Sequence, residues 1–388
     1  MKKVCFFTGS RAEYGLLKPL MQDIKKDNEL NLQILVSGMH LSSEFGYTYK
    51  EIESDGFKID EKIEILLSSD SPIGLSKSLG LGMISFSEAL DRLSPNLLVI
   101  LGDRFEAFAV PIRAMLARDP IAHLHGGEST FGLIDEAIRH SITKMSSLHF
   151  VSTEEYRNRV IQLGEHPGTV KNVGAIGLDG VRKLNLLSKQ DLEKNLGFKF
   201  NKHNVIVTFH PVTLEYNTSE RQFNALLQAL DELKDTNIIF TKSNADIEGR
   251  LINKMIDEYV AINSSRAIVL NSMGRFRYLS AVKCVDAVVG NSSSGIIEAP
   301  SFNVPTLNIG NRQKGRIQAD SIINCEPDFD SIKYGLAKIM KIGKQDVKNP
   351  YEQKNTVVNI KNHIKKYLDK DKLDLKKCFY DIKIQEYV

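Results

Sequence analysis

The stretch VCFFTGSRAEYGLLKPLMQDIKKD, residues 4–27, indicates the fold class. It consists of an apolar run at 4–8, a glycine turn at Gly9, and a segment whose apolar residues recur at helical spacing. A strand that passes through a tight turn into an amphipathic helix is the repeating unit of parallel sheets covered by helices. Because similar units recur along the chain, we predict an α/β protein built on parallel sheets.

Further strands are predicted wherever short β-branched or aromatic runs occur. In the first half these are 32–37, 97–102, 121–125, 148–152 and 170–174, and in the second half 204–209, 237–241, 267–270, 285–290, 305–310 and 321–325. Amphipathic helices are predicted between them, including 15–27, 104–117, 134–145 and 223–235.

A junction between two domains is predicted in NVGAIGLD, residues 172–179, where two glycines follow a strand. A chain of 388 residues also exceeds the usual span of one hydrophobic core. We therefore expect two Rossmann-type, doubly wound domains, at 1–175 and 176–350, facing each other across a cleft. Ligands of such sheets bind at the carboxyl ends of the strands. The remaining 351–388 is expected to form a helix and tail that pack back on the first domain.

Composition excludes several classes of function. Hydrophobic residues make up 42% and the formal net charge is +3, with scattered basic residues, which argues against a nucleic-acid partner. No apolar stretch reaches the roughly 20 residues of a membrane span, and the first apolar run is a strand rather than a signal peptide. The 4 cysteines are far apart and three lie in or beside apolar runs, so we expect buried thiols and a cytoplasmic location.

Acid–base candidates follow two neighbouring strands, in LGDRFE (101–106) and AHLHGGESTFGLIDEAIRHS (122–141). They are Asp103, His125, Glu128, Asp135, Glu136 and Arg139. One alternative is that Asp135–Arg139 and Glu136–His140 are only exposed salt bridges at helical spacing. A metal site on His123 and His125 is the other alternative, but no third ligand follows at zinc spacing. We therefore expect no metal, and no nicotinamide cofactor because a GxGxxG motif is missing.

A phosphate cradle is predicted in VVGNSSSG, residues 288–295, where a strand runs through small hydroxyl residues into a helix. Backbone N–H groups and serine hydroxyls suit a pyrophosphate there. Glu298, expected on the first turn of that helix, suits ribose hydroxyls. Together with other residues just past strands, the predicted nucleotide-binding set is Arg11, Arg104, His210, Ser243, Asn244, Asn291, Ser292, Ser293, Ser294, Gly295, Glu298 and Arg312.

Collinear motifs across nearly the whole chain resemble one family, the hydrolysing UDP-N-acetylglucosamine 2-epimerases. These motifs are GSRAEYG, GDR followed by HLHGGE, DEAIRHSITKM, TFHP, SNAD, GNSSSGIIE and NIGNRQKGR. The resemblance implies a GT-B-like fold, a nucleotide-sugar substrate, and homodimers or homotetramers. It places UDP at Arg11, His210, Asn244, Ser292, Ser293, Glu298 and Arg312. It places catalytic acids at Asp103, Glu128 and Asp135. Some relatives have Glu where this chain has His125, so the proton donor and acceptor stay open.

The resemblance also implies a reaction: UDP is eliminated from UDP-N-acetylglucosamine, and water adds to give N-acetylmannosamine for sialic acid synthesis. One alternative substrate is a GDP- or UDP-linked 2,4-diacetamido-trideoxyhexose on the route to legionaminic acid. A GT-B glycosyltransferase would need an acceptor site and a basic membrane face, and neither is visible. A non-catalytic sensor of nucleotide sugars would be expected to lack Asp103 or Glu128, and both are present.

Overall fold

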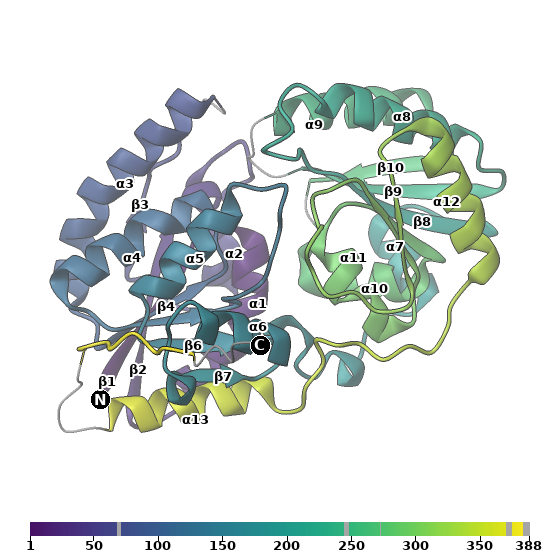
Figure 1. The fold of residues 1–388 in the computed structure, drawn as a ribbon. Coiled ribbons are helices and arrows are strands. Elements are labelled where there is room, and N and C mark those ends of the chain that lie inside the picture. The colour runs from purple at the N-terminus through teal and green to yellow at the C-terminus, as the bar shows by residue number, and fades with distance from the viewer. Residues whose placement is uncertain (68–70, 244–247, 272, 370–374, 383–388) are drawn as a thin grey trace, which may run out of the picture. The chain divides into compact units, whose positions relative to one another are not determined.

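The computed structural model describes residues 1–67, 71–243, 248–271, 273–369 and 375–382, and Figure 1 draws the fold. The chain divides into two units. Unit 1 comprises Met1–Glu128, Asp135–Asp179 and Tyr351–Val388, and unit 2 comprises Ser129–Ile134 and Gly180–Pro350. The short segment Ser129–Ile134 thus belongs to unit 2, although the residues on either side of it belong to unit 1.

Unit 1 is built on a 7-stranded parallel sheet with the order β3-β2-β1-β4-β5-β6-β7. The strands are β1 (Lys2–Thr8), β2 (Leu30–Ser37), β3 (Glu61–Ile63), β4 (Leu97–Leu101), β5 (Ile121–Leu124), β6 (Leu148–Val151) and β7 (Val170–Asn172). The helices are α1 (Arg11–Lys25), α2 (Tyr49–Ser54), α3 (Pro72–Leu93), α4 (Phe105–Ala117), α5 (Asp135–Met145), α6 (Glu154–Gln162) and α13 (Thr356–Leu368). Strand β3 was not predicted, because it is short, half-buried and mostly charged.

Helix α1 begins at Arg11, four residues before the predicted start. Ser10 caps it: the backbone N–H of Glu13 donates to the Ser10 hydroxyl, and the Glu13 carboxylate accepts from the Ser10 N–H. This reciprocal capping box satisfies N–H groups that a helix start otherwise leaves unpaired. It turns the glycine-containing loop into the first turn of a helix, directly after the buried strand β1.

Unit 2 contains a 6-stranded parallel sheet with the order β10-β9-β8-β11-β12-β13. The strands are β8 (His203–Thr208), β9 (Thr236–Thr241), β10 (Ala267–Leu270), β11 (Ala287–Gly290), β12 (Thr306–Ile309) and β13 (Ile322–Cys325). The helices are α7 (Lys189–Leu196), α8 (Ser219–Asp231), α9 (Gly249–Ile262), α10 (Gly274–Cys284), α11 (Ser293–Ile297) and α12 (Phe329–Ile342).

Both sheets follow the strand order of a Rossmann fold, in which the first and fourth strands lie side by side at the centre. In unit 1 these strands are β1 and β4, with Val4 opposite Leu97. In unit 2 they are β8 and β11, with Thr208 opposite Gly290. The prediction of two Rossmann-type parallel sheets is confirmed. The crevice at such a central pair is where ligands of these folds bind.

The C-terminal helix α13 packs on unit 1, and Figure 1 shows it in yellow along that unit. Its buried residues Val357, Ile360, Ile364 and Leu368 join the apolar core that also contains α1 and β1. The backbone N–H groups of Thr356 and Val357 donate to the Asp179 carboxylate at 3.2 and 3.0 Å, which caps the start of the helix.

The segment after this helix, at 375–382, is held on unit 1 by a buried carboxylate. The Lys377 ammonium lies 2.7 Å from Glu165 Oε2, and it also donates to the carbonyls of Lys144 and Ser146. Burial alone would raise the pKa of Glu165, but hydrogen bonds from His149, Lys144 and Lys377 outweigh it and lower the pKa to about 2. An ion pair at Lys377 therefore holds this segment to the rest of unit 1.

The cysteines are less buried than expected. All four are free thiols: Cys5 is buried, Cys284 and Cys325 are half-buried, and Cys378 is exposed. Among the described helices, none combines the length and apolar character that a membrane span requires.

The depressed pKa of Glu165 predicts a pH-dependent contribution to stability. We expect Glu165→Gln to lower the free energy of unfolding by about 2 kcal/mol near neutral pH, because it removes the buried negative charge that Lys144 and Lys377 neutralise. This contribution is fully present above the ordinary glutamate pKa of 4.5 and is lost as the pH falls toward about 2. Urea unfolding across this range should show the two proteins converging at low pH. The control is Glu155→Gln, whose side chain is 60% exposed. A difference that stays constant with pH would contradict the prediction.

Candidate functional site

Polar residues of unit 1 gather at the carboxyl ends of β4, β5 and β6, which are adjacent strands. Asp103 follows β4 through Gly102, whose φ is +74°. Glu128 lies on the loop after β5, Ser152 directly follows β6, and Asp135 is the first residue of α5. Since the carboxyl ends of parallel strands share one edge of the sheet, the predicted acids come together although they are far apart in the sequence.

Arg139 connects these residues. Its side chain is buried, and its Nε donates to Asp103 Oδ2 at 2.6 Å. Its Nη1 donates to Glu136 Oε2 at 2.8 Å and to the main-chain carbonyl of Glu128 at 2.6 Å. A buried guanidinium needs such partners because an unpaired charge in the interior is very costly. The interpretation of Arg139 as part of an exposed salt bridge is therefore wrong. The pair Glu136–His140 does form, at 3.0 Å.

His125 and Glu128 form a second group at the same edge. His125 Nδ1 lies 2.8 Å from Glu128 Oε1, and the Ser152 hydroxyl donates to the same oxygen at 3.1 Å. His125 has a φ of +65°, an unfavourable conformation for a residue with a Cβ, and such strain concentrates at functional sites. Its Nε2 is buried and has no hydrogen-bond partner among the described residues. One ring nitrogen of His125 therefore makes no hydrogen bond to the described residues.

His123 has a different environment from His125. It is fully buried, with Nε2 2.7 Å from the Gly102 carbonyl and Nδ1 3.1 Å from the Thr143 hydroxyl. Burial lowers the pKa of His123 to about 3, so the ring is neutral and supports the turn before Asp103. His125 lies beyond the end of β5, so only His123 of this pair is part of the strand. Among the described residues, no group of three or more His, Cys, Asp or Glu could hold a metal ion.

The two arginines of unit 1 that were predicted to bind phosphate form ion pairs with carboxylates. Arg104 donates to Glu106 at 2.8 and 3.2 Å, and Glu106 is fully buried. Arg11 pairs with Glu51. Each of these two cations thus already has an anionic neighbour within unit 1.

Glu13 is a titratable group at this edge that sequence analysis missed. Its Oε2 accepts from the N–H groups of Gly9 and Ser10 at 2.7 and 3.1 Å, beside Arg104 and Glu106. Burial raises the pKa of Glu13 to about 7, and the positive charge of Arg104 opposes part of that shift. The spacing Ser10-x-x-Glu13 is a capping-box signature, so the sequence did contain a signal for its position.

In unit 2, hydrogen bonds join the loops after β8, β9 and β11. The His210 N–H donates to Asn291 Oδ1 at 2.8 Å, and Asn291 Nδ2 donates back to the His210 carbonyl at 2.8 Å. His210 Nδ1 lies 3.0 Å from the Ser243 hydroxyl. These residues meet at the central strand pair β8 and β11, which is the ligand-binding position of this fold.

The loop after β12 reaches the same place. Arg312 Nη1 and Gln313 Nε2 both donate to the Asn291 carbonyl, at 3.4 and 2.8 Å. Gln313 is buried and was not predicted. No sequence pattern around Gln313 distinguishes this residue from a surface glutamine. Asn244 of the predicted set lies outside the described residues.

The segment at residues 290–295, which we call the serine loop, begins at a strand end where only glycine fits. Gly290 has a φ of +125°, and a Cβ there would lie 2.0 Å from the Thr208 carbonyl oxygen. Ser292 then caps α11 by accepting from the Ser294 N–H at 3.3 Å, so Ser293, Ser294 and Gly295 form the first turn. Glu298 follows the last residue of this short helix, so its expected place on the first turn is wrong.

The segment Ser129–Ile134 forms its own hydrogen bonds within unit 2. The Phe131 N–H donates to the Lys314 carbonyl at 3.0 Å, and the Leu214 N–H donates to the Gly132 carbonyl at 3.1 Å. The chain therefore leaves unit 1 after Glu128 and returns at Asp135. Both flanking residues are predicted catalytic acids.

Two Rossmann-type sheets, each with polar loops at its central strand pair, define a two-domain protein of the GT-B-like fold class. A family model described as UDP-N-acetylglucosamine 2-epimerase matches residues 22–365, and the chain belongs to this family.

Similar proteins include a Campylobacter jejuni protein named GDP/UDP-N,N'-diacetylbacillosamine 2-epimerase (hydrolyzing), 47% identical over 84% of both chains. The Escherichia coli polysialic acid biosynthesis protein P7 is 38% identical over 98% of both chains. Among solved structures, an S. aureus MnaA–UDP complex matches with a TM-score of 0.78 at 17% identity, covering 98% of this chain and 100% of that one. At this identity the structural match supports the fold alone.

The glycine at the serine loop gives a prediction. Gly290→Ala should lower the free energy of unfolding by about 2–4 kcal/mol, because the methyl group meets a main-chain oxygen of the neighbouring strand. Gly197→Ala is the matched control: its φ is also positive, at +63°, but its Cβ would meet nothing within 4 Å. Urea unfolding of both variants measures the difference. Equal losses would mean that only the backbone conformation, and not the close approach, requires glycine at 290.

Proposed function

We propose that this chain is a hydrolysing 2-epimerase that cleaves a nucleotide-linked 2-acetamido sugar and inverts its C2 centre. The observation that carries the proposal is the acidic group of unit 1, in which buried Arg139 fixes Asp103 and Glu136 beside the His125–Glu128 pair. Family membership supports the same reaction class. The four free cysteines support a reducing compartment, so we also propose a cytoplasmic location.

We assign nucleotide binding to unit 2. His210, Asn291, Ser292, Ser293 and Arg312 present donors at the central strand pair, where a diphosphate would accept them. Such donors interact more strongly as negative charge develops on the departing oxygen, so they favour cleavage of the bond between C1 and the nucleotide. This matters because the C2 proton is barely acidic until that bond has begun to break.

We assign proton transfer to unit 1. A base removes the C2 proton while the nucleoside diphosphate leaves C1, which gives a 2-acetamidoglucal. Water then adds its oxygen to C1, and a proton is delivered to the opposite face of C2. Asp103, paired with Arg139, and the His125–Glu128 pair are two groups with separate hydrogen-bond environments. Removal and return of a proton at opposite faces require two such groups. Asp135 begins the helix that carries Arg139 and completes the set.

The substrate has two candidates. The relative with 47% identity is named for diacetylbacillosamine, and this favours a GDP- or UDP-linked 2,4-diacetamido sugar as the first choice. The description of the family model keeps UDP-N-acetylglucosamine, with N-acetylmannosamine as its product, as the second. The identity to the polysialic acid protein P7 is lower, at 38%, but extends over 98% of the chain.

The experiment is a direct comparison of substrates. Purified protein is incubated with UDP-N-acetylglucosamine and with the UDP- and GDP-linked 2,4-diacetamido sugars, and free sugar and nucleotide are followed by proton NMR. We expect the highest kcat/KM with a diacetamido sugar and release of the C2-inverted sugar. Release of sugar with its original C2 configuration would show that the protein hydrolyses the substrate without epimerising it. No release from any of the three would reject the proposal.

Replacing one acid tests the assigned chemistry. Asp103→Asn keeps the shape of the side chain but cannot take a proton, so turnover should fall at least about a hundredfold while the affinity for UDP stays within a few-fold. Exposed Asp330 on α12 offers the same change as a control, and Asp330→Asn should keep normal turnover. Initial rates and calorimetry give the two quantities. Near-normal turnover of Asp103→Asn would remove this residue from the mechanism.

A further inference from the structure

A second guanidinium besides Arg139 binds the main chain of the loop that carries Glu128. Arg159 lies on α6, and its Nη1 donates to the Gly127 carbonyl at 2.6 Å. Arg139, on α5, donates to the next carbonyl along the chain, that of Glu128, also at 2.6 Å. Two consecutive carbonyl groups of this loop are therefore held by side chains from two different helices.

These two hydrogen bonds fix the backbone conformation of Glu128. The Gly127 carbonyl belongs to the peptide group before Glu128, and the Glu128 carbonyl belongs to the peptide group after it. Because each peptide group is planar, holding both planes leaves Glu128 little freedom in φ and ψ. The direction of its Cα–Cβ bond is then set, and with it the position of the carboxylate oxygen that lies 2.8 Å from His125 Nδ1.

Helix α6 also supports the loop by direct contact. Gly127 has a φ of +76°, and a Cβ there would lie 2.4 Å from the Tyr156 carbonyl oxygen and 2.8 Å from Val160 Cγ2. The loop thus lies against α6 at a distance that only glycine allows. The His125 N–H donates to the Phe150 carbonyl at 2.8 Å, so the start of the loop is bound to β6.

Arg159 is oriented by two residues of its own helix. Its guanidinium carbon lies 5.3 Å from the centre of the Tyr156 ring, and its Nη2 donates to the Glu155 carboxylate at 3.2 Å. The Arg159 side chain is 26% exposed. Stacking on an aromatic ring together with an ion pair restricts the planar guanidinium to one direction. The Nη1 group therefore points at the Gly127 carbonyl.

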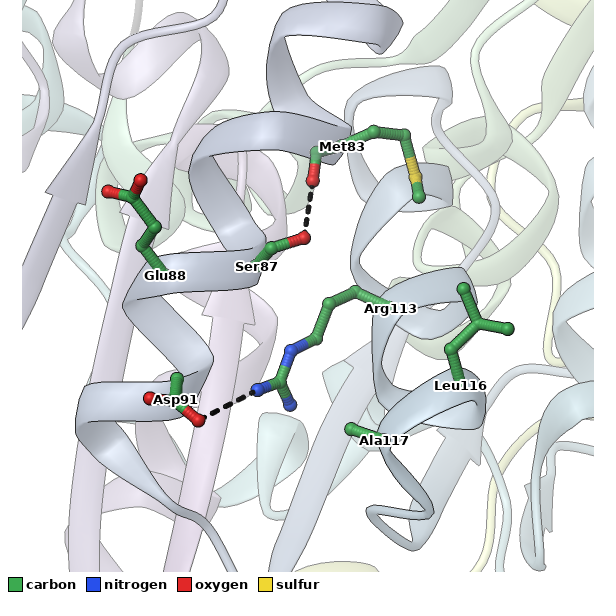
Figure 2. A pocket seen from close by; sticks show the side chains of 7 residues that line it. All are labelled: Met83, Ser87, Glu88, Asp91, Arg113, Leu116 and Ala117. Carbon is green, nitrogen blue, oxygen red and sulfur yellow. Dashed lines mark hydrogen bonds and ion pairs between the residues drawn. The ribbon is translucent and has the colours of Figure 1, made fainter.

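Arg113 shows a different use of arginine in unit 1. It lines a hollow of about 460 Å³ between α3 and α4, and Figure 2 shows it extending toward Asp91. It also pairs with Asp119. These partners are side-chain carboxylates, whereas the shortest contact of Arg159 is with a main-chain carbonyl. Arg159 thus acts on the backbone, directly beside a predicted catalytic acid.

From these contacts we infer that Arg159 is a positioning residue for the proposed reaction. It acts through the Gly127 carbonyl and keeps Glu128 where the His125–Glu128 pair can transfer a proton. In this role Arg159 neither gives nor takes a proton itself. The inference rests on the proposed function, because it concerns the geometry of a pair to which that function assigns a proton transfer.

The first test measures the loop itself, by amide hydrogen exchange of the whole protein without substrate. We expect Arg159→Met to speed exchange in peptides that cover residues 125–128 by about tenfold or more, because a charge-assisted hydrogen bond to this loop is lost. The matched control is Arg157→Met on the same helix, where the side chain is 29% exposed. Arg157 donates to the Val170 carbonyl instead, so its loss should leave exchange at 125–128 unchanged.

The second test separates turnover from binding. With the substrate that the wild type converts fastest, Arg159→Met should lower kcat at least about tenfold. Its affinity for UDP, measured by calorimetry, should stay within about threefold, because nucleotide binding is assigned to unit 2. Arg159→Lys keeps a cationic donor for the Gly127 carbonyl and should recover kcat to within about threefold of the wild type. The control Arg157→Met should keep normal kcat.

Failure of this inference and failure of the proposed function give different results. Unchanged exchange at 125–128 in Arg159→Met would overturn the inference, whether or not the wild type is active. Normal kcat in Arg159→Met would overturn it as well, and so would equal losses of kcat in Arg159→Met and Arg157→Met. A wild type that releases sugar from none of the three nucleotide sugars would reject the proposed function, and with it this role of Arg159.

Discussion

The buried ion pair between Arg139 and Asp103 is the constraint on which the chemistry proposed for unit 1 depends. A guanidinium that is almost inaccessible to water must be neutralised within hydrogen-bond distance, and Asp103 and Glu136 provide the negative charge. Since Arg139 also binds the Glu128 carbonyl, it fixes the backbone at the point where the chain leaves unit 1. One side chain on α5 thereby positions acids that follow two different strands.

The repeated strand order explains why polar residues gather at one edge of each sheet. In both units the chain reverses its direction of strand addition at the central pair, and the loops that follow this pair diverge and leave space. Unit 1 has capped Glu13 after β1 and Asp103 after β4, and unit 2 has His210 after β8 and Asn291 after β11. The same topology thus supports acids in one unit and hydrogen-bond donors in the other.

Most strands, and the helices α1, α4, α5 and α8, were predictable because a buried parallel strand must be a short apolar run, and the helices covering it must be amphipathic. Strand β3 was not predicted because its three residues are half-buried and mostly charged. The burial of Arg139 could not be predicted. Its spacing of four residues from Asp135 is the same whether that face of the helix is exposed to solvent or buried. The left-handed His125 and the passage of Ser129–Ile134 into unit 2 depend on contacts distant in sequence, which no local pattern encodes.

The central claim, that a proton is removed from C2 and another is returned to the opposite face, is tested most directly by the fate of hydrogen at that carbon. The reaction is run in D₂O without added cofactor, and the released sugar is examined by proton NMR. Elimination followed by hydration predicts one deuterium at C2 of the inverted sugar, together with free nucleoside diphosphate. A product that keeps protium at C2 would contradict the account, because hydrolysis at C1 alone leaves C2 untouched.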